Sequence, residues 1–464
     1  MPSTQPSTDH SLMPQRAEPP VSSDIPMREA FFVWLRIALL SFGGPAGQIA
    51  LMHRELVDER KWISDARFIH ALNFCMLLPG PEAQQLATYI GWLLHGVRGG
   101  VMAGTLFVLP GFFVIVTLSI VYALYGALDV LAGLFFGLKA AVLAIVIEAL
   151  LRIARRALKT KALYALAAVT FVAIFGFHIP FPLIIVAAGV LGLLAAQLSP
   201  GLLGGSSVPD DQSDRAADVA AEARAAPTLT RGLKVIAVCC SLWIAPVVMV
   251  VLVFGRSSVY PAIAAFFSEM AVVTFGGAYA VLAYVAQAAV NDLHWLRPGE
   301  MLDGLALAET TPGPLILVLT FVGFLAGFRD PGGIAPLAGG LIGASLTTWV
   351  TFVPCFLWVL LGAPYIERLR NNRALSGALA AITAAVVGVI LNLTVWFALH
   401  VLFRNVGELD LGWLRPAWPE WLSIDWKAAL LSAFAMLAMF RWHLGMLPTL
   451  AVCGAAGLVL KFAV

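Results

Sequence analysis

"LLPGPEAQQ", residues 77–85, decides the fold because it puts the poorest helix formers inside a long apolar segment. Pro79 and Pro81 lack the amide hydrogen that a helix needs, and Gly80 lets the chain turn. In hydrocarbon, a broken helix is tolerated only where protein or a water-filled cavity satisfies the freed backbone groups. We therefore predict a helix that is broken near mid-membrane, with free amides at the start of its second half. Such a helix N-terminus carries roughly half a positive charge and attracts anions.

The composition places this break in a membrane protein. The 464 residues are 60% hydrophobic and only 12% charged, whereas soluble domains carry about 25% charged residues. We predict an all-α polytopic integral membrane protein. The net charge of +2 gives no indication of a nucleic-acid partner. Apolar stretches predict about thirteen transmembrane helices, at 31–51, 68–95, 101–123, 129–151, 162–177, 180–197, 233–254, 262–288, 303–327, 335–361, 374–402, 427–441 and 445–462.

A repeat relates the two parts of the chain. "SFGGPAG" at 41–47 returns as "TFGGAYA" at 274–280, "KWIS" at 61–64 as "HWLR" at 294–297, and "LLPGP" at 77–81 as "TTPGP" at 310–314. The residue numbers differ by 233 in each pair, and the Gly99-Gly100 pair maps onto Gly332-Gly333 with the same shift. Chance matches would not share one offset, so the chain contains two copies of one unit.

The basic loops indicate that the two copies have opposite orientations. Lys and Arg in short loops mark the cytoplasmic side of a membrane protein. The basic loop "LRIARRALKTK", 151–161, follows the fourth helix of the first copy, whereas "IERLRNNR", 366–373, precedes the fourth helix of the second. We predict inverted-topology repeats with broken helices, as in many secondary transporters. The expected segments are a disordered cytoplasmic tail (1–28), the first repeat (29–198), a flexible cytoplasmic linker (199–232), a connecting transmembrane helix (233–255), the second repeat (256–402) and a C-terminal loop with a helical hairpin (403–464).

The candidate substrate-binding residues surround the breaks. Glycine-rich backbone and polar side chains at this depth usually face a cavity or a partner, and interhelical hydrogen bonding is the alternative for each polar one. The predicted set is Arg36, Phe42, Gly43, Gly44, Asn73, Pro79, Gly80, Pro81, Glu82, Gln84, Gln85, Phe275, Gly276, Gly277, Thr310, Thr311, Pro312, Gly313 and Pro314. Arg36 precedes the FGG element and is expected to aim its guanidinium at an oxyanion. Thr88 and Glu309 belong to the same polar surroundings, and Lys139 is expected to snorkel or to pair with an acid.

Several of these motifs resemble the chromate ion transporter family in its long, two-domain form. The resemblance rests on "FGGPAGQIALMHRELVDERKWIS", "LLPGPEAQQLATYIGW" and "FVLPGFF", and it covers residues 30 to 400. It implies bacterial inner-membrane export of chromate, chromate resistance and two oppositely oriented halves. The family pattern carries over to Phe42, Gly43, Gly44, Pro45, Trp62, Pro79, Gly80, Pro81 and Pro110. The chain departs from it at Gln48, where many members carry histidine, and at Ala278, the counterpart of Pro45.

Combined with the resemblance, the residues predict a secondary transporter that exports chromate by alternating access. A transporter of sulfate or another oxyanion is the nearest alternative. A second alternative is an intramembrane enzyme that uses Glu82 and Glu309 as a carboxylate pair, and a third is a membrane scaffold. The chain has no GxxxxGK[ST] and no HExxH motif, so it has no sequence signature of an ATP-driven pump or a zinc protease. We expect no enzymatic activity, cofactor or metal. The expected partners are chromate, sulfate as a second anion, the lipid bilayer and a second copy in a homodimer. The expected location is the inner membrane, with the N-terminus in the cytoplasm.

Overall fold

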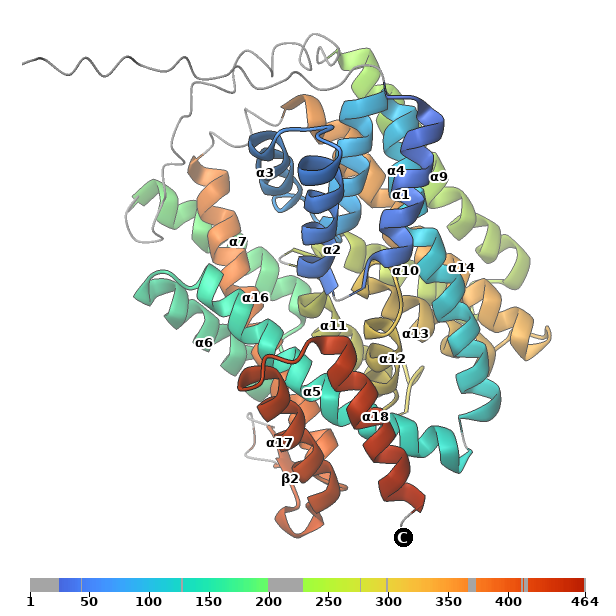
Figure 1. Ribbon diagram of the computed structural model, residues 1–464, viewed down its shortest axis with the longest axis vertical. Helices are drawn as coiled ribbons and strands as arrows, with labels where there is room; N and C mark the ends of the chain where they lie inside the picture. The colour runs from blue at the N-terminus through green and yellow to red at the C-terminus, as the bar shows by residue number, and fades with distance from the viewer. Residues whose placement is uncertain are drawn as a thin grey trace, which may run out of the picture.

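The computed structural model describes residues 25–42, 44–126, 128–198, 228–275, 277–297, 299–365, 373–409, 412 and 416–462. These residues are almost entirely helical (Figure 1). The predicted tail (1–28) and linker (199–232) fall mostly outside the described residues, as do Gly43, Gly276 and the basic loop up to residue 372. The all-α architecture that the composition predicts is confirmed.

The first half of the chain is a run of helices joined by short turns. Its elements are α1 (Met27–Leu40), α2 (Gly44–His53), the π-helical turn Arg54–Glu59, α3 (Asp65–Cys75), α4 (Glu82–Tyr125), α5 (Asp129–Ala157), α6 (Lys161–Phe177) and α7 (Phe181–Leu198). Helix α9 (Leu229–Phe254) precedes the second half.

The second half repeats this order. Its elements are α10 (Val259–Val273), α11 (Ala278–Gln287), the π-helical turn Ala288–Asp292, α12 (Glu300–Glu309), the 3-10 turn Leu315–Leu317, α13 (Val318–Arg329), α14 (Pro336–Gly362), the 3-10 turn Ala363–Tyr365 and α16 (Arg373–Leu402). The C-terminal part contains β1 (Val406–Glu408) antiparallel to β2 (Ala417–Pro419), the 3-10 turn Trp421–Ser423, α17 (Trp426–Phe440) and α18 (Met446–Phe462). The predicted C-terminal loop therefore contains a small strand pair ahead of the helical hairpin.

The described residues contain both long and shorter apolar helices, as expected for a polytopic membrane protein. Six described helices are long and apolar enough to cross a membrane, and five further apolar helices are shorter. Each of the expected spans 31–51, 68–95, 262–288 and 303–327 is divided into two shorter elements. Two of these divisions lie at the PGP motifs, as predicted. The other two lie at the FGG elements, where hydropathy showed a continuous apolar run because glycine and phenylalanine do not interrupt it.

Helix α4 is itself a hairpin. The backbone at His95 and Gly96 is non-helical, and Gly96 has a φ of +62°. Beyond this turn the chain packs back on itself: a Cβ at Gly91 would lie 2.5 Å from the carbonyl oxygen of Gly99. In the second half, α13 and α14 pack in the same way, since a Cβ at Gly327 would lie 2.3 Å from the carbonyl oxygen of Gly339. Small residues thus let both hairpins close tightly.

The offset of 233 extends to the backbone conformation. Lys61 and its counterpart His294 are both non-glycine residues with positive φ, at 52° and 51°. Each follows a π-helical turn in its own half. This agreement at strained positions supports the sequence repeat, because non-glycine residues rarely adopt such angles.

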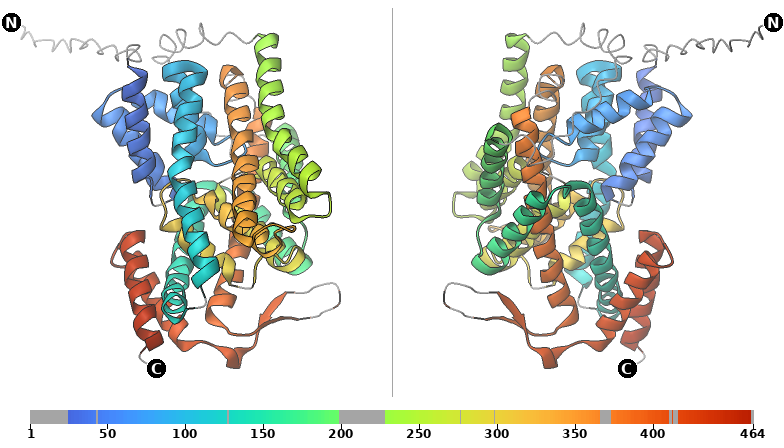
Figure 2. Two further views of the ribbon diagram at one scale, coloured as in Figure 1. Left: turned by 90° about the vertical axis from the view of Figure 1, so that its right-hand side faces the viewer. Right: turned by 90° about the vertical axis from the view of Figure 1, so that its left-hand side faces the viewer.

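The matched long helices of the two halves run antiparallel. Figure 2 shows the second part of α4 beside α14. Gly104, early in that part of α4, lies against Phe356 near the end of α14. Tyr122, at the other end of α4, contacts Phe321 of α13, and the neighbouring Gly323 faces Thr347 near the start of α14. Opposite directions for equivalent helices are what inverted repeats require.

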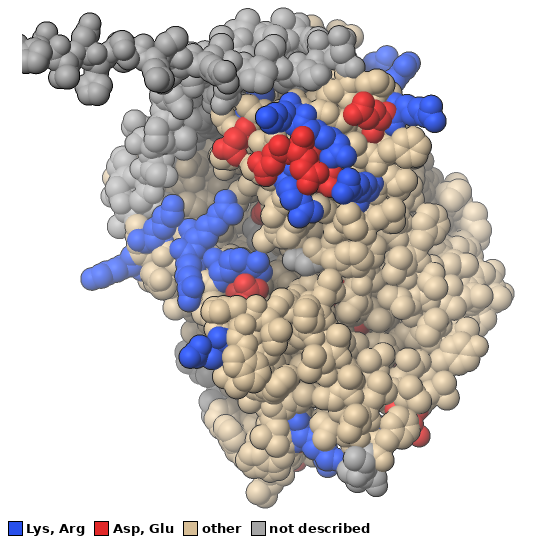
Figure 3. Space-filling view, viewed as in Figure 1, with Lys and Arg blue, Asp and Glu red and all other residues tan. Residues whose placement is uncertain are grey.

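A charged loop follows α2 and is visible as a group of blue and red residues in Figure 3. Nε2 of His53 lies 2.6 Å from Oδ1 of Asp65, and Nδ1 lies 3.3 Å from Oδ2 of Asp58. The hydrogen bond to Asp65 is the main cause that raises the pKa of His53 above its ordinary value, and the charge of Asp58 adds to it. The neighbouring Glu55 is buried and pairs with Arg60. The loop therefore holds its histidine with two carboxylates.

We expect Gly137→Ala to destabilise the protein. A Cβ at Gly137 would lie 1.9 Å from the carbonyl oxygen of Cys453 on α18, and such overpacking costs about 1–3 kcal/mol. Thermal unfolding in detergent measures the effect. Gly189→Ala is the matched control, because its nearest neighbour is the flexible Ile382 side chain at 3.4 Å and alanine favours helix. Equal melting temperatures for the two variants would contradict this packing.

We also expect the stabilising effect of His53 to depend on pH. Because the pKa of His53 is raised in the folded state, its contribution is fully present below the unfolded value of about 6.5 and is lost as the pH rises through the folded pKa. The difference in melting temperature between the natural protein and His53→Gln should therefore shrink from about pH 6.5 upward. The difference is small, because both aspartates are exposed. A constant difference over the whole pH range would contradict the charged pairing.

Candidate functional site

Two crossed hydrogen bonds join the four helix breaks. The N–H of Gly80 donates to the carbonyl of Thr274 at 2.7 Å, and the N–H of Gly313 donates to the carbonyl of Ser41 at 2.9 Å. Gly80 and Gly313 are equivalent under the repeat, and so are Ser41 and Thr274. Each PGP motif is thus bound to the residue that precedes the FGG element of the opposite half, and each of the two junctions contains backbone from both halves.

These bonds involve the glycine amides inside the breaks, whereas the free amides were predicted at the start of the helices that follow. The N–H groups of Gly80 and Gly313 are occupied and do not point to an open site. The carbonyls that they satisfy lie at the C-terminal ends of α1 and α10, which carry the negative end of the helix dipole. The donors nearest to these junctions are the first-turn amides of the helices that follow the breaks, which have no intrahelical partner. These helices are α2, α4, α11 and the one that opens with the turn at Leu315.

The helices that follow the breaks have no side-chain cap at three of their N-termini. Pro81, Gly277 and Pro314 are the N-cap residues of α4, α11 and the turn at Leu315, and none of them supplies a side-chain cap. The first backbone bonds inside these helices are donated by later residues, such as Gln85, whose N–H reaches the carbonyl of Pro81 at 3.1 Å. Uncapped helix N-termini are anion-binding elements.

The two PGP glycines need their positive φ angles and have crowded surroundings. Gly80 has a φ of +124°, and a Cβ there would lie 2.8 Å from Sγ of Cys355 on α14. Gly313 has a φ of +98°. Gly111 of α4 presses on the second break, since its Cβ would lie 2.2 Å from the carbonyl oxygen of Pro312. Each break therefore rests against a long helix of the opposite half.

Three buried glutamines surround the breaks. Nε2 of Gln85 donates to the carbonyl of Pro79 at 2.6 Å, and Nε2 of Gln48 donates to the carbonyl of Gly313 at 2.6 Å. Gln84 donates to the hydroxyl of Thr88 at 3.1 Å. All three Oε1 atoms are buried without a hydrogen-bond partner among the described residues. The glutamines thus hold the broken backbone and leave acceptor atoms unsatisfied beside it.

Thr310 and Thr311 have a capping role in the structure. Their hydroxyls donate to the carbonyls of Leu307 at 2.8 Å and Ala308 at 2.9 Å. Glu309, the last residue of α12, accepts a hydrogen bond of 2.7 Å from the hydroxyl of Tyr279. The end of α12 is therefore closed by side chains of its own break and by α11.

Three other predicted residues take no part in the crossed hydrogen bonds. Nε of Arg36 lies 3.4 Å from Oε1 of Glu55, and its side chain is 55% exposed, so the guanidinium pairs with an acid of the charged loop. Asn73 is exposed on α3. Glu82 is half-buried in the first turn of α4, where Arg156 is the cation whose charge acts on it. No hydrogen bond between Glu82 and Glu309 occurs among the described residues.

The remaining members of the predicted set form the breaks themselves. Pro81, Pro312 and Pro314 are buried, and Pro79 is half-buried. Phe42 and Phe275 are half-buried and follow Ser41 and Thr274 in the chain. Gly44 is the first residue of α2, Gly277 directly precedes α11, and both have positive φ angles. The sequence analysis missed Ser41, Thr274, Gln48 and Tyr279. Ser41 and Thr274 share the repeat offset, and this signal could have identified them.

Lys139 pairs with an acid, which is one of its two predicted roles. Its Nζ lies 3.1 Å from Oδ1 of Asp303, and the hydroxyl of Tyr122 donates to Oδ2 at 2.9 Å. Asp303 is buried near the start of α12. This contact joins α4, α5 and α12 at the end of α12 that lies away from the break.

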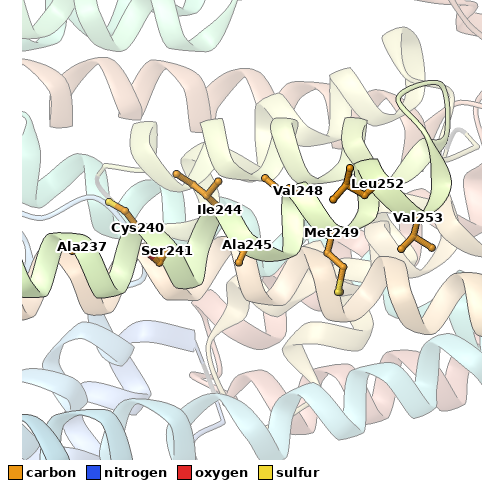
Figure 4. Close-up of a pocket in the computed structure, with 9 residues that line it drawn as sticks. All are labelled: Ala237, Cys240, Ser241, Ile244, Ala245, Val248, Met249, Leu252 and Val253. Atoms are coloured by element: carbon orange, nitrogen blue, oxygen red, sulfur yellow. The ribbon is translucent and has the colours of Figure 1, made fainter.

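An apolar recess of about 720 Å³ lies along α9, away from the breaks (Figure 4). All nine lining residues belong to this helix: Ala237, Cys240, Ser241, Ile244, Ala245, Val248, Met249, Leu252 and Val253. A polar anion needs donors that replace its water, and this face offers a single hydroxyl. The recess is therefore an apolar outer face of α9, and the candidate site is at the crossed breaks.

We expect Gly111→Ala to abolish transport while the protein still folds. The added methyl group would collide with the carbonyl of Pro312 and displace the PGP motif from its crossed hydrogen bond. Substrate flux into vesicles measures the loss, with size-exclusion chromatography to confirm folding. Gly232→Ala on α9 is the matched control, because its Cβ would meet only Leu361 at 3.8 Å. Full flux in Gly111→Ala would show that the position of Pro312 is not needed.

Comparison with known proteins agrees with this geometry. The chromate transporter family model matches residues 28–193 and 261–458, one region in each half. A chromate transport protein of Pseudomonas aeruginosa is 32% identical over 411 residues, which cover 87% of this chain and 89% of the relative. A chromate transport protein of Cupriavidus metallidurans is 28% identical over 370 residues, 78% of this chain and 80% of the relative.

A probable chromate transport protein of Synechococcus elongatus is 28% identical over 361 residues, 77% of this chain and 81% of the relative. No solved structure matches the chain. The family model covers both helix breaks of both halves, and the relatives span most of the chain. This chain therefore belongs to the chromate transporter family.

Proposed function

We propose that the protein exports chromate across the bacterial inner membrane by alternating access around the crossed breaks. The observation that carries the proposal is the pair of hydrogen bonds from Gly80 to Thr274 and from Gly313 to Ser41. They place uncapped helix N-termini of both halves at shared junctions. Support for chromate as the substrate comes from the family and from the names of the relatives.

The chemistry of the site suits a tetrahedral dianion. Chromate has no apolar surface to bury, so a binding site must replace its water with hydrogen-bond donors. Backbone amides at helix N-termini supply such donors without a costly buried cation. Arg36 is engaged by Glu55, and we therefore assign recognition to the amides of the first turns after the breaks. Sulfate has the same shape and charge, so these donors do not by themselves distinguish the two anions.

The membrane potential favours export. An inside-negative potential contributes about 2.3 kcal/mol per elementary charge for each 100 mV, so a dianion that leaves the cell gains about 4.6 kcal/mol. Outward transport in this scheme confers chromate resistance. This scheme has the N-terminus on the cytoplasmic side, together with the basic residues at the end of α5, which are exposed (Figure 3). A homodimer and a preference between chromate and sulfate stay predictions.

The packing supports alternating access by movement of one half against the other. The α4 hairpin and the α13–α14 hairpin are closed by glycine contacts, so each is a stiff unit that begins at a PGP motif. The crossed bonds connect these units to the FGG elements of the opposite half. A rocking movement would change the two junctions in opposite senses, because the halves are inverted.

Labelled chromate and inside-out membrane vesicles test the proposal. Vesicles that contain the protein should accumulate chromate when respiration makes their interior positive, and an ionophore that collapses the potential should reduce uptake. Vesicles with Gly111→Ala are the matched control. Equal uptake with and without the protein would defeat the export claim. Strong competition by excess sulfate would show that the protein accepts oxyanions more broadly than chromate alone.

A further inference from the structure

Glu309 is a buried carboxyl group that has no role in the proposed transport cycle described above. It ends α12 directly before the Thr310–Pro314 break and is 2% exposed. Its Oε1 accepts the hydroxyl of Tyr279 at 2.7 Å. Its Oε2 is buried and has no hydrogen-bond partner among the described residues. One oxygen of this carboxyl is thus fixed, and the other is unpartnered beside the break.

The charges around Glu309 do not provide a counter-ion. The charged groups that act on it are Arg152 and Glu148 of α5, and these two pair with each other at 3.1 Å. On α13, Arg329 pairs with Glu300 at 2.7 Å. On α4, Tyr122 faces α12 and donates a hydrogen bond to Asp303. Lys139 of α5 forms an ion pair with the same aspartate. Among the described residues, no ion pair includes Glu309.

An ionised carboxylate is unfavourable in this position for two reasons. Burial without a paired cation removes its water without compensation, and the C-terminal end of a helix repels negative charge. A neutral carboxyl avoids both costs, and its hydroxyl then needs an acceptor. The described protein atoms offer no acceptor to Oε2, whereas an oxyanion at the adjacent break is a strong one.

We propose that Glu309 binds one proton and that its neutral carboxyl, oriented by Tyr279, donates a hydrogen bond to the transported oxyanion. The proton comes from water on the side from which the anion enters and returns to water when Glu309 loses its ligand. The inference rests on the proposed transport function and adds a proton to it. The repeat counterparts of Tyr279 and Glu309 are Ala46 and Met76, so the chain carries this group in its second half alone.

Glu309→Gln tests the proposal, because the amide keeps a neutral donor of the same shape and cannot titrate. Vesicle uptake is measured from acid to alkaline pH, and the ratio of variant to natural rates is compared, since titration of the anion itself affects both equally. We expect the natural protein to lose activity as the pH rises, by up to about tenfold per pH unit for one proton. The ratio should therefore increase with pH. A ratio that stays constant would overturn the proposal.

Two further variants separate a proton site from a structural role. Tyr279→Phe removes the hydrogen bond to Oε1 and should displace the pH profile without flattening it. Glu269→Gln, an exposed acid on α10, should leave the profile unchanged. Absence of transport by the natural protein would contradict the proposed function itself. Transport with a pH-independent ratio would contradict only the role of Glu309.

Infrared difference spectroscopy gives a readout that does not depend on flux. When chromate is added to the purified natural protein, the carbonyl band of a protonated carboxyl should shift, because its hydroxyl gains an acceptor. The shift should be absent in Glu309→Gln and present in Glu269→Gln. An unchanged band in the natural protein, or the same shift in Glu309→Gln, would show that Glu309 does not donate to the anion.

Discussion

The structure depends on the need to satisfy backbone groups where helices break in a low-dielectric interior. A break leaves carbonyls on one side and amides on the other, and each unpaired group is costly away from water. Here the glycine of each PGP motif donates to the carbonyl that ends a helix of the opposite half. This exchange joins the two halves through their backbones. The first turns after the breaks carry no side-chain caps, and the proposed anion site uses their amides.

The two halves share this backbone and differ in their side chains. The first break is surrounded by amides and by Glu82 in the first turn of α4, whereas the second has two capping threonines and the Glu309–Tyr279 pair. The crossed bonds join main-chain atoms, so the side-chain differences between the two halves do not remove their donors or acceptors. The repeat can therefore keep its geometry while each half acquires its own chemistry. This division agrees with a site in which both halves bind and one half carries the titrating group.

Sequence reasoning succeeded where the signal was local. The PGP motifs predicted two breaks, because proline and glycine act on their own turn of helix. The FGG breaks were missed because hydropathy does not detect them. Arg36 was expected beside the anion, yet the fold gives it Glu55 from beyond α2. Gln48 and Tyr279 joined the site only through contacts with residues far along the chain.

By itself, the sequence determined the membrane class, the repeat with its offset of 233, the inverted orientation and the two PGP interruptions. Each of these follows from composition or from short-range stereochemistry. The tertiary structure decided which carbonyl receives each glycine amide and that, among the described residues, the second carboxyl oxygen of Glu309 lacks a partner. The physical reason is that hydrogen-bond satisfaction in the interior depends on which segments the fold brings together, and the two crossed pairs lie 194 (274 − 80) and 272 (313 − 41) residues apart in the chain.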